Sequence, residues 1–160
     1  MKKLFTLILI MLLALSMTGT AFAEDSSREY LFRLSIDGSD TKKAEPGDII
    51  TLMFSLERCD SDESADIYAM QNEIRYDSSF FELIEGSELL ADGIQMRDLG
   101  LRDDNRELYM NFLSLSGGSK WKANTTVGTV QLRVIGQTGS SVISNEDYAV
   151  STADGLDRFK

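Results

Sequence analysis

The side chains that most often carry out chemistry in proteins are scarce in this sequence. The 160-residue chain contains no histidine, which removes the commonest general base, the serine–histidine triad and most zinc sites. Glu73 and Asp77 are the carboxylates that could be nominated for glycoside hydrolysis, which needs only two such groups. On an extended strand their four-residue spacing places them roughly 13 Å apart, farther than either glycosidase geometry. The sequence therefore predicts a protein that is not an enzyme.

A polar loop that begins at residue 59 raises the question of calcium binding. Its carboxylates are Asp60, Asp62, Glu63 and Asp66. Carboxylate oxygens suit calcium, but the loop lacks the central glycine and the late bidentate glutamate of an EF-hand. Charge runs usually stay hydrated, so we predict a solvated loop with no metal and no cofactor.

The only cysteine, Cys59, cannot form an internal disulfide, and we interpret it as incidental rather than as a link to another chain.

The aromatic residues raise the alternative of carbohydrate recognition. The only tryptophan, Trp121, could stack against sugar rings together with three tyrosines. These are Tyr68, Tyr109 and Tyr148. One indole among scattered tyrosines is not a planar row, so we favour the interpretation that Trp121 packs over an edge of the fold.

The first 23 residues have the pattern of a bacterial secretory signal peptide. Lys2 and Lys3 form a charged start, an apolar run follows at 4–17, and Ala-Phe-Ala at 21–23 is a small-x-small cleavage site. The apolar run is too short for a comfortable membrane span. We therefore expect cleavage after Ala23, a secreted protein and no membrane span in the mature chain.

The balance of charge excludes one class of partner. Sixteen basic and 26 acidic residues give a net charge of −10, and loss of Lys2 and Lys3 with the signal peptide changes it to −12. Such a surface repels phosphate backbones and anionic lipid. Nucleic acid is therefore not expected as a partner.

Mostly apolar and mostly polar positions alternate at 67–76, which predicts a β-strand with two different faces. One face carries Met70, Asn72, Ile74 and Tyr76, and the other carries Ala69, Gln71, Glu73 and Arg75. Period-two alternation is typical of a sheet with one buried face and one solvated face. The outward face has no obvious reactive groups, so it suggests a surface for a partner rather than a pocket for chemistry.

The rest of the chain reads as further short strands. Strands are predicted at 30–36, 49–56, 80–84, 107–115, 127–135 and 141–150, with a short helical turn at 87–91, short strands or irregular segments at 94–96 and 99–101, and a hairpin turn at 103–105. In the segment 127–135 the pattern places Val127 with Thr129 and opposite Val130. Short strands separated by polar turns predict an all-β fold, a two-sheet antiparallel sandwich or jelly roll. The expected organisation is a signal peptide at 1–23, a flexible leader at 24–29, the sandwich at 30–153 and a C-terminal tail at 154–160.

The order of these segments resembles the cohesin domains of bacterial cellulosomes and related cell-surface proteins. The resemblance covers roughly residues 30–150 and rests on GDIITLMFSL at 47–56, IYAMQNEIRYDSSFFEL at 67–83, LYMNFLSLSGG at 108–118 and VGTVQLRVIG at 127–136. It implies a nine-stranded jelly roll that binds a dockerin, a small helical pair that itself carries calcium, on one flat sheet face. Carried over by alignment, the face consists of Ala69, Gln71, Glu73, Tyr109, Asn111 and Leu113.

Two departures from the family pattern affect what the resemblance implies. Well-known members have Asn and Asp where this chain has Ala69 and Gln71, so a dockerin recognised here is expected to be of a divergent type. Tyr109 is then the expected anchor, because tyrosine is over-represented among binding hot spots. The family normally ends with a further strand near the first one, whereas residues 154–160 leave little room for it. We expect either a missing last strand with an exposed edge or a sandwich closed differently.

Three functions follow from these observations. The leading hypothesis is a non-catalytic secreted module that binds a dockerin-bearing protein and so assembles or tethers polysaccharide-degrading enzymes. The alternatives are a carbohydrate-binding module, which would bind polysaccharide directly, and a structural or adhesive surface domain. An exposed row of aromatics would favour carbohydrate binding, whereas a flat mixed face favours protein recognition.

Overall fold

The computed structural model describes residues 29–102 and 105–159, and all regular secondary structure in these residues is β-strand. The strands are β1 (Tyr30–Ile36), β2 (Ile49–Arg58), β3 (Ala65–Asp77), β4 (Phe81–Leu83), β5 (Leu89–Leu90), β6 (Gln95–Arg102), β7 (Asn105–Leu113), β8 (Ser119–Trp121), β9 (Asn124–Val134), β10 (Ser144–Thr152) and β11 (Leu156–Phe159). The described part contains no helix long and apolar enough to cross a membrane. The predicted signal peptide and the turn residues 103–104 lie outside the described residues.

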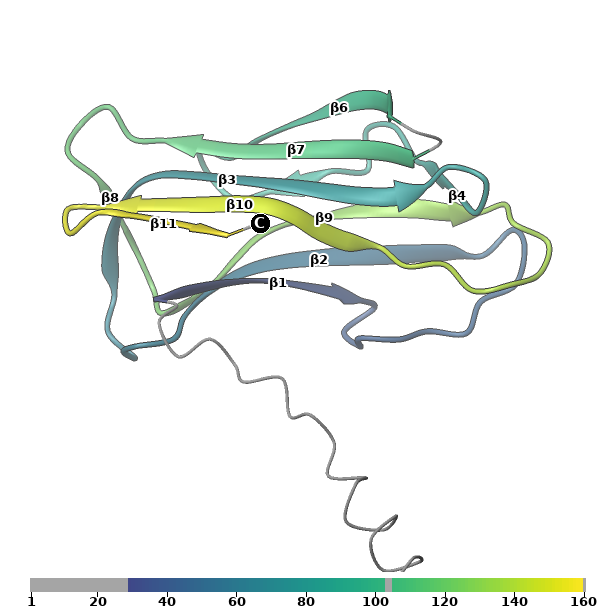
Figure 1. The fold of residues 1–160 in the computed structure, drawn as a ribbon, viewed down its shortest axis with the longest axis horizontal. Helices are drawn as coiled ribbons and strands as arrows, with labels where there is room; N and C mark the ends of the chain where they lie inside the picture. The colour runs from purple at the N-terminus through teal and green to yellow at the C-terminus, as the bar shows by residue number, and fades with distance from the viewer. Residues whose placement is uncertain (1–28, 103–104, 160) are drawn as a thin grey trace, which may run out of the picture.

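The strands form two sheets that are stacked as layers (Figure 1). The first sheet has the order β1-β2-β9-β4, with β5 also paired to β9. The second sheet has the order β11-β10-β3-β7-β6, with β8 also paired to β3. Every strand pair is antiparallel. The predicted all-β, two-sheet antiparallel sandwich is therefore confirmed.

Alternating side chains of the two central strands β3 and β7 form the core between the layers. Met70, Ile74 and Tyr76 are at most 2% exposed, as are Leu108 and Met110. The facing strands of the first sheet add further apolar side chains, of which Leu52, Phe54, Val130 and Leu132 are fully buried. The Phe32 ring contacts both the Phe54 ring and, across the layers, the Tyr148 ring, with ring centroids 6.4 and 6.1 Å apart.

A β-bulge makes the predicted face of Val127 wrong. The register of β2 against β9 shifts between Phe54 and Ser55, which pair with Gly128 and Thr126. The extra residue, Val127, turns into the core and is fully buried, although the simple alternation placed it with Thr129 on the outer face. A bulge re-aims one side chain in this way without ending the strand.

The middle of the chain also differs from the expectation. Residues 87–91 were expected to form a helical turn, but Leu89 and Leu90 pair with Thr129 and Gly128 as strand β5. The short segments expected at 94–96 and 99–101 are one strand, β6, with a register shift between Asp98 and Gly100. Pairing with a neighbouring strand determines the secondary structure of both segments, because neither shows a clear alternation of apolar and polar residues.

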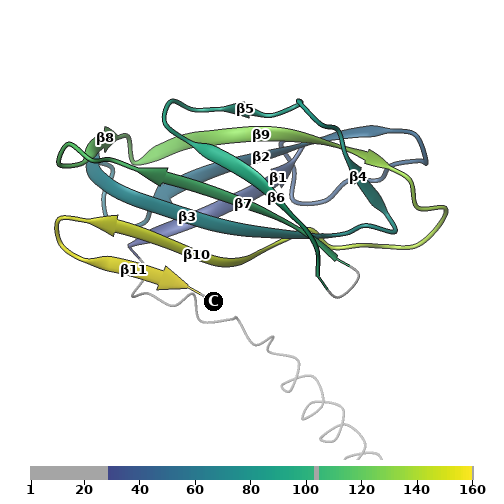
Figure 2. The ribbon, with the colours of Figure 1, turned by 90° about the horizontal axis from the view of Figure 1, so that it is seen from above.

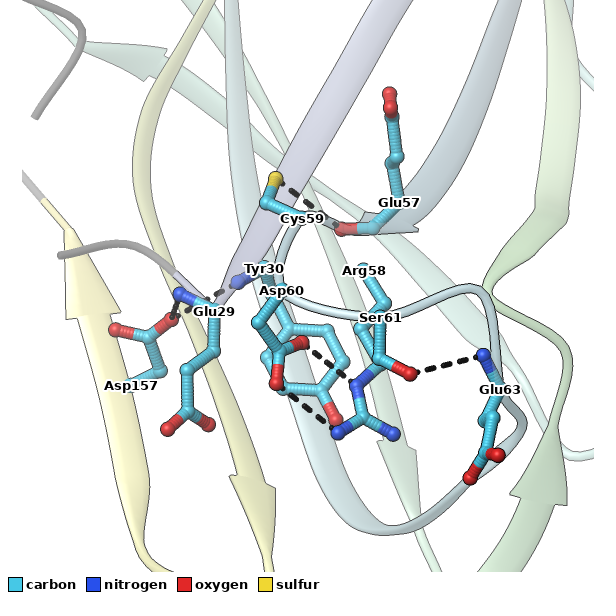
Figure 3. A network of polar contacts seen from close by, with 9 residues as sticks. All are labelled: Glu29, Tyr30, Glu57, Arg58, Cys59, Asp60, Ser61, Glu63 and Asp157. Carbon is cyan, nitrogen blue, oxygen red and sulfur yellow. Dashed lines mark hydrogen bonds and ion pairs between the residues drawn. The ribbon is translucent and has the colours of Figure 1, made fainter. Parts of the chain in front are cut away.

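The C-terminal segment forms a strand, although a missing last strand was one of the two alternatives expected for this end of the sandwich. Residues 156–159, predicted as part of a tail, form β11, which pairs with β10 at the edge of the second sheet (Figure 2). The Asp157 carboxylate also accepts hydrogen bonds from the backbone amides of Glu29 and Tyr30, both at 3.2 Å (Figure 3). The sandwich is therefore closed by a hairpin strand that reaches the start of β1.

Candidate partner-binding face

The six predicted site residues lie together on the outer face of β3 and β7. The register of these strands places Ala69 opposite Leu113, Gln71 opposite Asn111 and Glu73 opposite Tyr109. Directly opposite side chains on one face of an antiparallel pair lie about 5 Å apart at their Cβ atoms. The six residues therefore form three cross-strand pairs. They share the outer face, since the residues that alternate with them along both strands point into the core.

A groove of about 510 Å³ lies over this face. Five of the six predicted residues line it, and Glu73 is the one that does not. The complete lining is Ala69, Met70, Gln71, Gly93, Gln95, Tyr109, Asn111, Phe112, Leu113, Leu115, Ala149, Ser151 and Leu156. The groove thus spans β6, β7, β3, β10 and β11, and is wider than the two strands that the sequence indicated.

Sequence reasoning missed the groove residues that lie on the flanking strands. Gln95 of β6 pairs with Asn111, while Ser151 of β10 pairs with both Ala69 and Leu156. The signal that could have found them is the strand order, since outward residues at the same level of neighbouring strands share one surface.

Tyr109 in the groove and Arg75 near it have defined polar partners. The Tyr109 hydroxyl donates to Gln71 Oε1 at 3.5 Å, so the expected anchor is held over the middle of the face. Next to Glu73 on the same face, Arg75 Nη2 lies 2.7 Å from Glu107 Oε1, and Arg75 Nη1 lies 3.5 Å from Glu146 Oε2. Glu107 is only 3% exposed, so this ion pair supports the end of the face rather than offering a free carboxylate.

The two carboxylates that could be nominated for glycoside hydrolysis lie on one strand. Glu73 and Asp77 both lie on β3, and Asp77 accepts hydrogen bonds from the hydroxyl and the amide of Ser79, which lower the pKa of its carboxyl. Asp77 therefore stabilises the turn after β3.

The acidic loop after β2 contains an ion pair. Arg58 Nε and Nη2 donate to the two carboxylate oxygens of Asp60 at 2.7 and 3.0 Å, and these bonds lower the pKa of Asp60 (Figure 3). Within residues 29–102 and 105–159, no group of three His, Cys, Asp or Glu side chains is arranged to hold a metal ion. Cys59 is exposed, and its Sγ lies 4.0 Å from the Glu57 carbonyl oxygen (Figure 3).

Two of the four aromatic residues considered for carbohydrate recognition pack in or against the core. Tyr148 is 6% exposed and belongs to the core. Trp121 packs against Phe112, with ring centroids 4.9 Å apart, and against the core cluster. The interpretation that Trp121 packs over an edge of the sandwich is confirmed.

Comparison with known proteins agrees with this architecture. The family model of the cohesin domain matches residues 34–160. A cohesin module of a family 33 glycoside hydrolase from Clostridium perfringens is 14% identical, with a TM-score of 0.57 over 81% of this chain and 93% of that chain. The cohesin of a type I cohesin–dockerin complex from Clostridium thermocellum is 20% identical, with a TM-score of 0.58 over 81% and 91%.

A third similar structure comes from outside the bacteria. The non-cellulosomal cohesin of the archaeon Archaeoglobus fulgidus is 12% identical, with a TM-score of 0.50 over 81% of this chain and 83% of that chain. The search of curated proteins gave no match. At these identities the structures share the fold with this chain, and the family match extends over most of its length. The chain belongs to the cohesin family.

Proposed function

We propose that this cohesin is a secreted, non-catalytic module that binds a dockerin-bearing protein through the outer face of β3 and β7. The observation that carries the proposal is the groove of about 510 Å³ on the face formed by the three cross-strand pairs. Similar solved structures include cohesins in complex with dockerins, which supports a partner of this class.

The composition of the face suits a protein partner. The groove over it combines a tyrosine, the amide side chains of Gln71 and Asn111, and exposed leucine side chains. Protein interfaces are typically built from such an apolar centre with a few hydrogen-bonding groups, and tyrosine is frequent among the residues that dominate affinity. In this proposal Tyr109 is the anchor, and the amides of Gln71 and Asn111 replace the charged group that the family usually has there.

The biological role follows from the partner and from the expected export. A secretory signal at 1–23 would place the module outside a bacterial cell, where a dockerin-bearing enzyme could be captured and tethered. The calcium belongs to the dockerin in this proposal, and the cohesin contributes a pre-formed sheet. Catalysis and polysaccharide contact are then properties of the captured protein.

A capture experiment tests the proposal. The purified protein is immobilised and incubated with secreted proteins of the source organism, with calcium or with a chelator, and captured proteins are identified by mass spectrometry. We expect calcium-dependent retention of a protein with a dockerin module, and no retention by the variant L113D.

The matched control is L89D, because Leu89 is 74% exposed on the first sheet and Leu113 is 67% exposed on the second. Equal loss with both variants would contradict the assigned face. Capture of no dockerin-bearing protein would overturn the proposed function, and tight retention on insoluble polysaccharide would favour the carbohydrate-binding alternative.

A further inference from the structure

One row of side chains across the second sheet extends the Ala69–Leu113 pair onto the two strands β10 and β11. Leu113 of β7 lies opposite Ala69 of β3, which lies opposite Ser151 of β10, which in turn lies opposite Leu156 of β11. All four residues line the groove. At a spacing of about 4.8 Å between strands, the two leucines stand on strands about 14 Å apart.

The row has two large side chains at its ends and two small ones between them. Leu113 and Leu156 are each 67% exposed. Ala69 and Ser151 carry only a methyl group and a hydroxymethyl group, so the middle of the row is lower than its ends. We call this row the leucine notch.

The groove that contains the leucine notch is uncharged. None of its 13 lining residues is acidic or basic, although 26% of the residues in the sequence are charged. A charged partner group placed there would lose water without gaining an opposite charge. An aliphatic partner side chain would instead cover two exposed leucines and gain from the burial of apolar surface.

We infer that the leucine notch receives an aliphatic side chain from an uncharged helix face of the dockerin, and that β11 is therefore part of the docking surface. This inference rests on the proposed function and names the partner chemistry that the site selects. Ala69 forms the floor of the notch, so one of the two residues that depart from the family pattern becomes a determinant of specificity. Charged side chains are absent from the lining, so binding depends little on salt.

The experiment uses the dockerin captured above, or calcium-loaded recombinant dockerin modules as a panel of probes, with affinity measured by calorimetry. We expect L156S to weaken binding about tenfold or more, because a leucine that is covered on binding is removed. The control L89S removes a leucine of similar exposure from the first sheet and should leave affinity unchanged.

Two further measurements keep the inference separate from folding effects and from the proposed function. Ala69→Leu fills the floor of the notch and should weaken binding at least as much as L156S, while Ser35→Leu on β1 should not. Amide chemical shifts of Ser151 and Leu156 should change on dockerin addition, and affinity should vary less than about threefold between 50 and 500 mM salt.

The outcomes divide clearly. If a dockerin binds and shifts Tyr109 and Asn111 but not Ser151 and Leu156, or if L156S and Ala69→Leu bind normally, the inference is wrong and the proposed function stands. If no dockerin in the panel or the secretome binds, both fall. A concentration-dependent dimer that L156S abolishes would assign the notch to a second copy of this chain and would also overturn the inference.

Discussion

Substitution of Asn145 by alanine should destabilise the fold strongly, because this side chain joins the two sheets. Asn72 Nδ2 donates to Asn145 Oδ1 at 3.0 Å, and Asn145 Nδ2 donates to the carbonyl of Phe32 in β1 at 2.9 Å. A register shift between Asn145 and Asp147 marks a bulge in β10 at this point. The single amide therefore links β3 and β10 of the second sheet to β1 of the first.

The magnitude follows from the groups that Asn145→Ala leaves without these partners. Asn72 is fully buried, so its amide group cannot turn to water. A buried polar group left unpaired costs about 1–3 kcal/mol, and we expect the Phe32 carbonyl to be at the lower end, since removal of the Asn145 side chain would open space for water beside this edge strand. The expected loss is about 2–4 kcal/mol, which corresponds to about 8–15 °C in melting temperature for a domain of this size.

Urea unfolding followed by fluorescence of the single tryptophan measures this loss. The matched control is Asn124→Ala, which removes the side chain of an exposed asparagine at the start of β9 and should cost less than about 0.5 kcal/mol. Adding Asn72→Ala to Asn145→Ala should cost about 1 kcal/mol less than Asn72→Ala alone, since the two amides are coupled. Equal stability of Asn145→Ala and the control would refute the reasoning.

Three other substitutions test the face, the electrostatics and the packing. Tyr109→Ala should weaken binding of the dockerin by about 1–3 kcal/mol in calorimetry, and unchanged affinity would mean that the face is misassigned. The side-chain hydrogen bond from Lys42 is the main cause that lowers the pKa of Asp37 below its usual 3.8. This carboxylate therefore stabilises the fold above about pH 4 and loses that contribution as the pH falls through its folded-state pKa. Asp37→Asn should remove part of the acid dependence of the melting temperature, and an unchanged pH profile would count against the ion pair. In Gly128→Ala the new Cβ would lie 2.7 Å from Leu90 Cδ2, so we expect a loss of about 1–3 kcal/mol in urea unfolding and faster hydrogen exchange in β5.

The sequence predicted the central strands well because their two faces meet different environments. Residues 69–76 of β3 pack one set of alternate side chains in the core and present the other set at the surface, so the period of two appears directly in the amino acids. The same holds for the middle of β7, where Leu108 and Met110 are buried. These two strands carry all six predicted face residues.

Two strands that the sequence did not predict, β5 and β11, form because neighbouring strands pair with them. Strand β5 is two residues long, and β9 holds it in place next to Ser87, whose Oγ accepts a hydrogen bond from the Gln131 amide. Strand β11 has only four residues, and the turn that returns it along β10 determines its pairing. Ser151 and Leu156 joined the candidate face only through these pairings, which a single sequence does not determine.

The hydrogen bonds from Glu29 and Tyr30 to Asp157 also bear on how the domain can be built into longer proteins. They bring the first described residue next to the last strand, at the end of the sandwich opposite the exposed connection 137–140 between β9 and β10 (Figure 1). Domains whose ends meet tolerate circular permutation and insertion into other chains. In a circularly permuted variant, the present ends would be linked near Asp157 and new ends would be opened within 137–140. This variant would keep the proposed docking face, but its connections to neighbouring domains would leave from the opposite end of the sandwich. Such a change offers a way to vary the spacing of modules along an engineered scaffold.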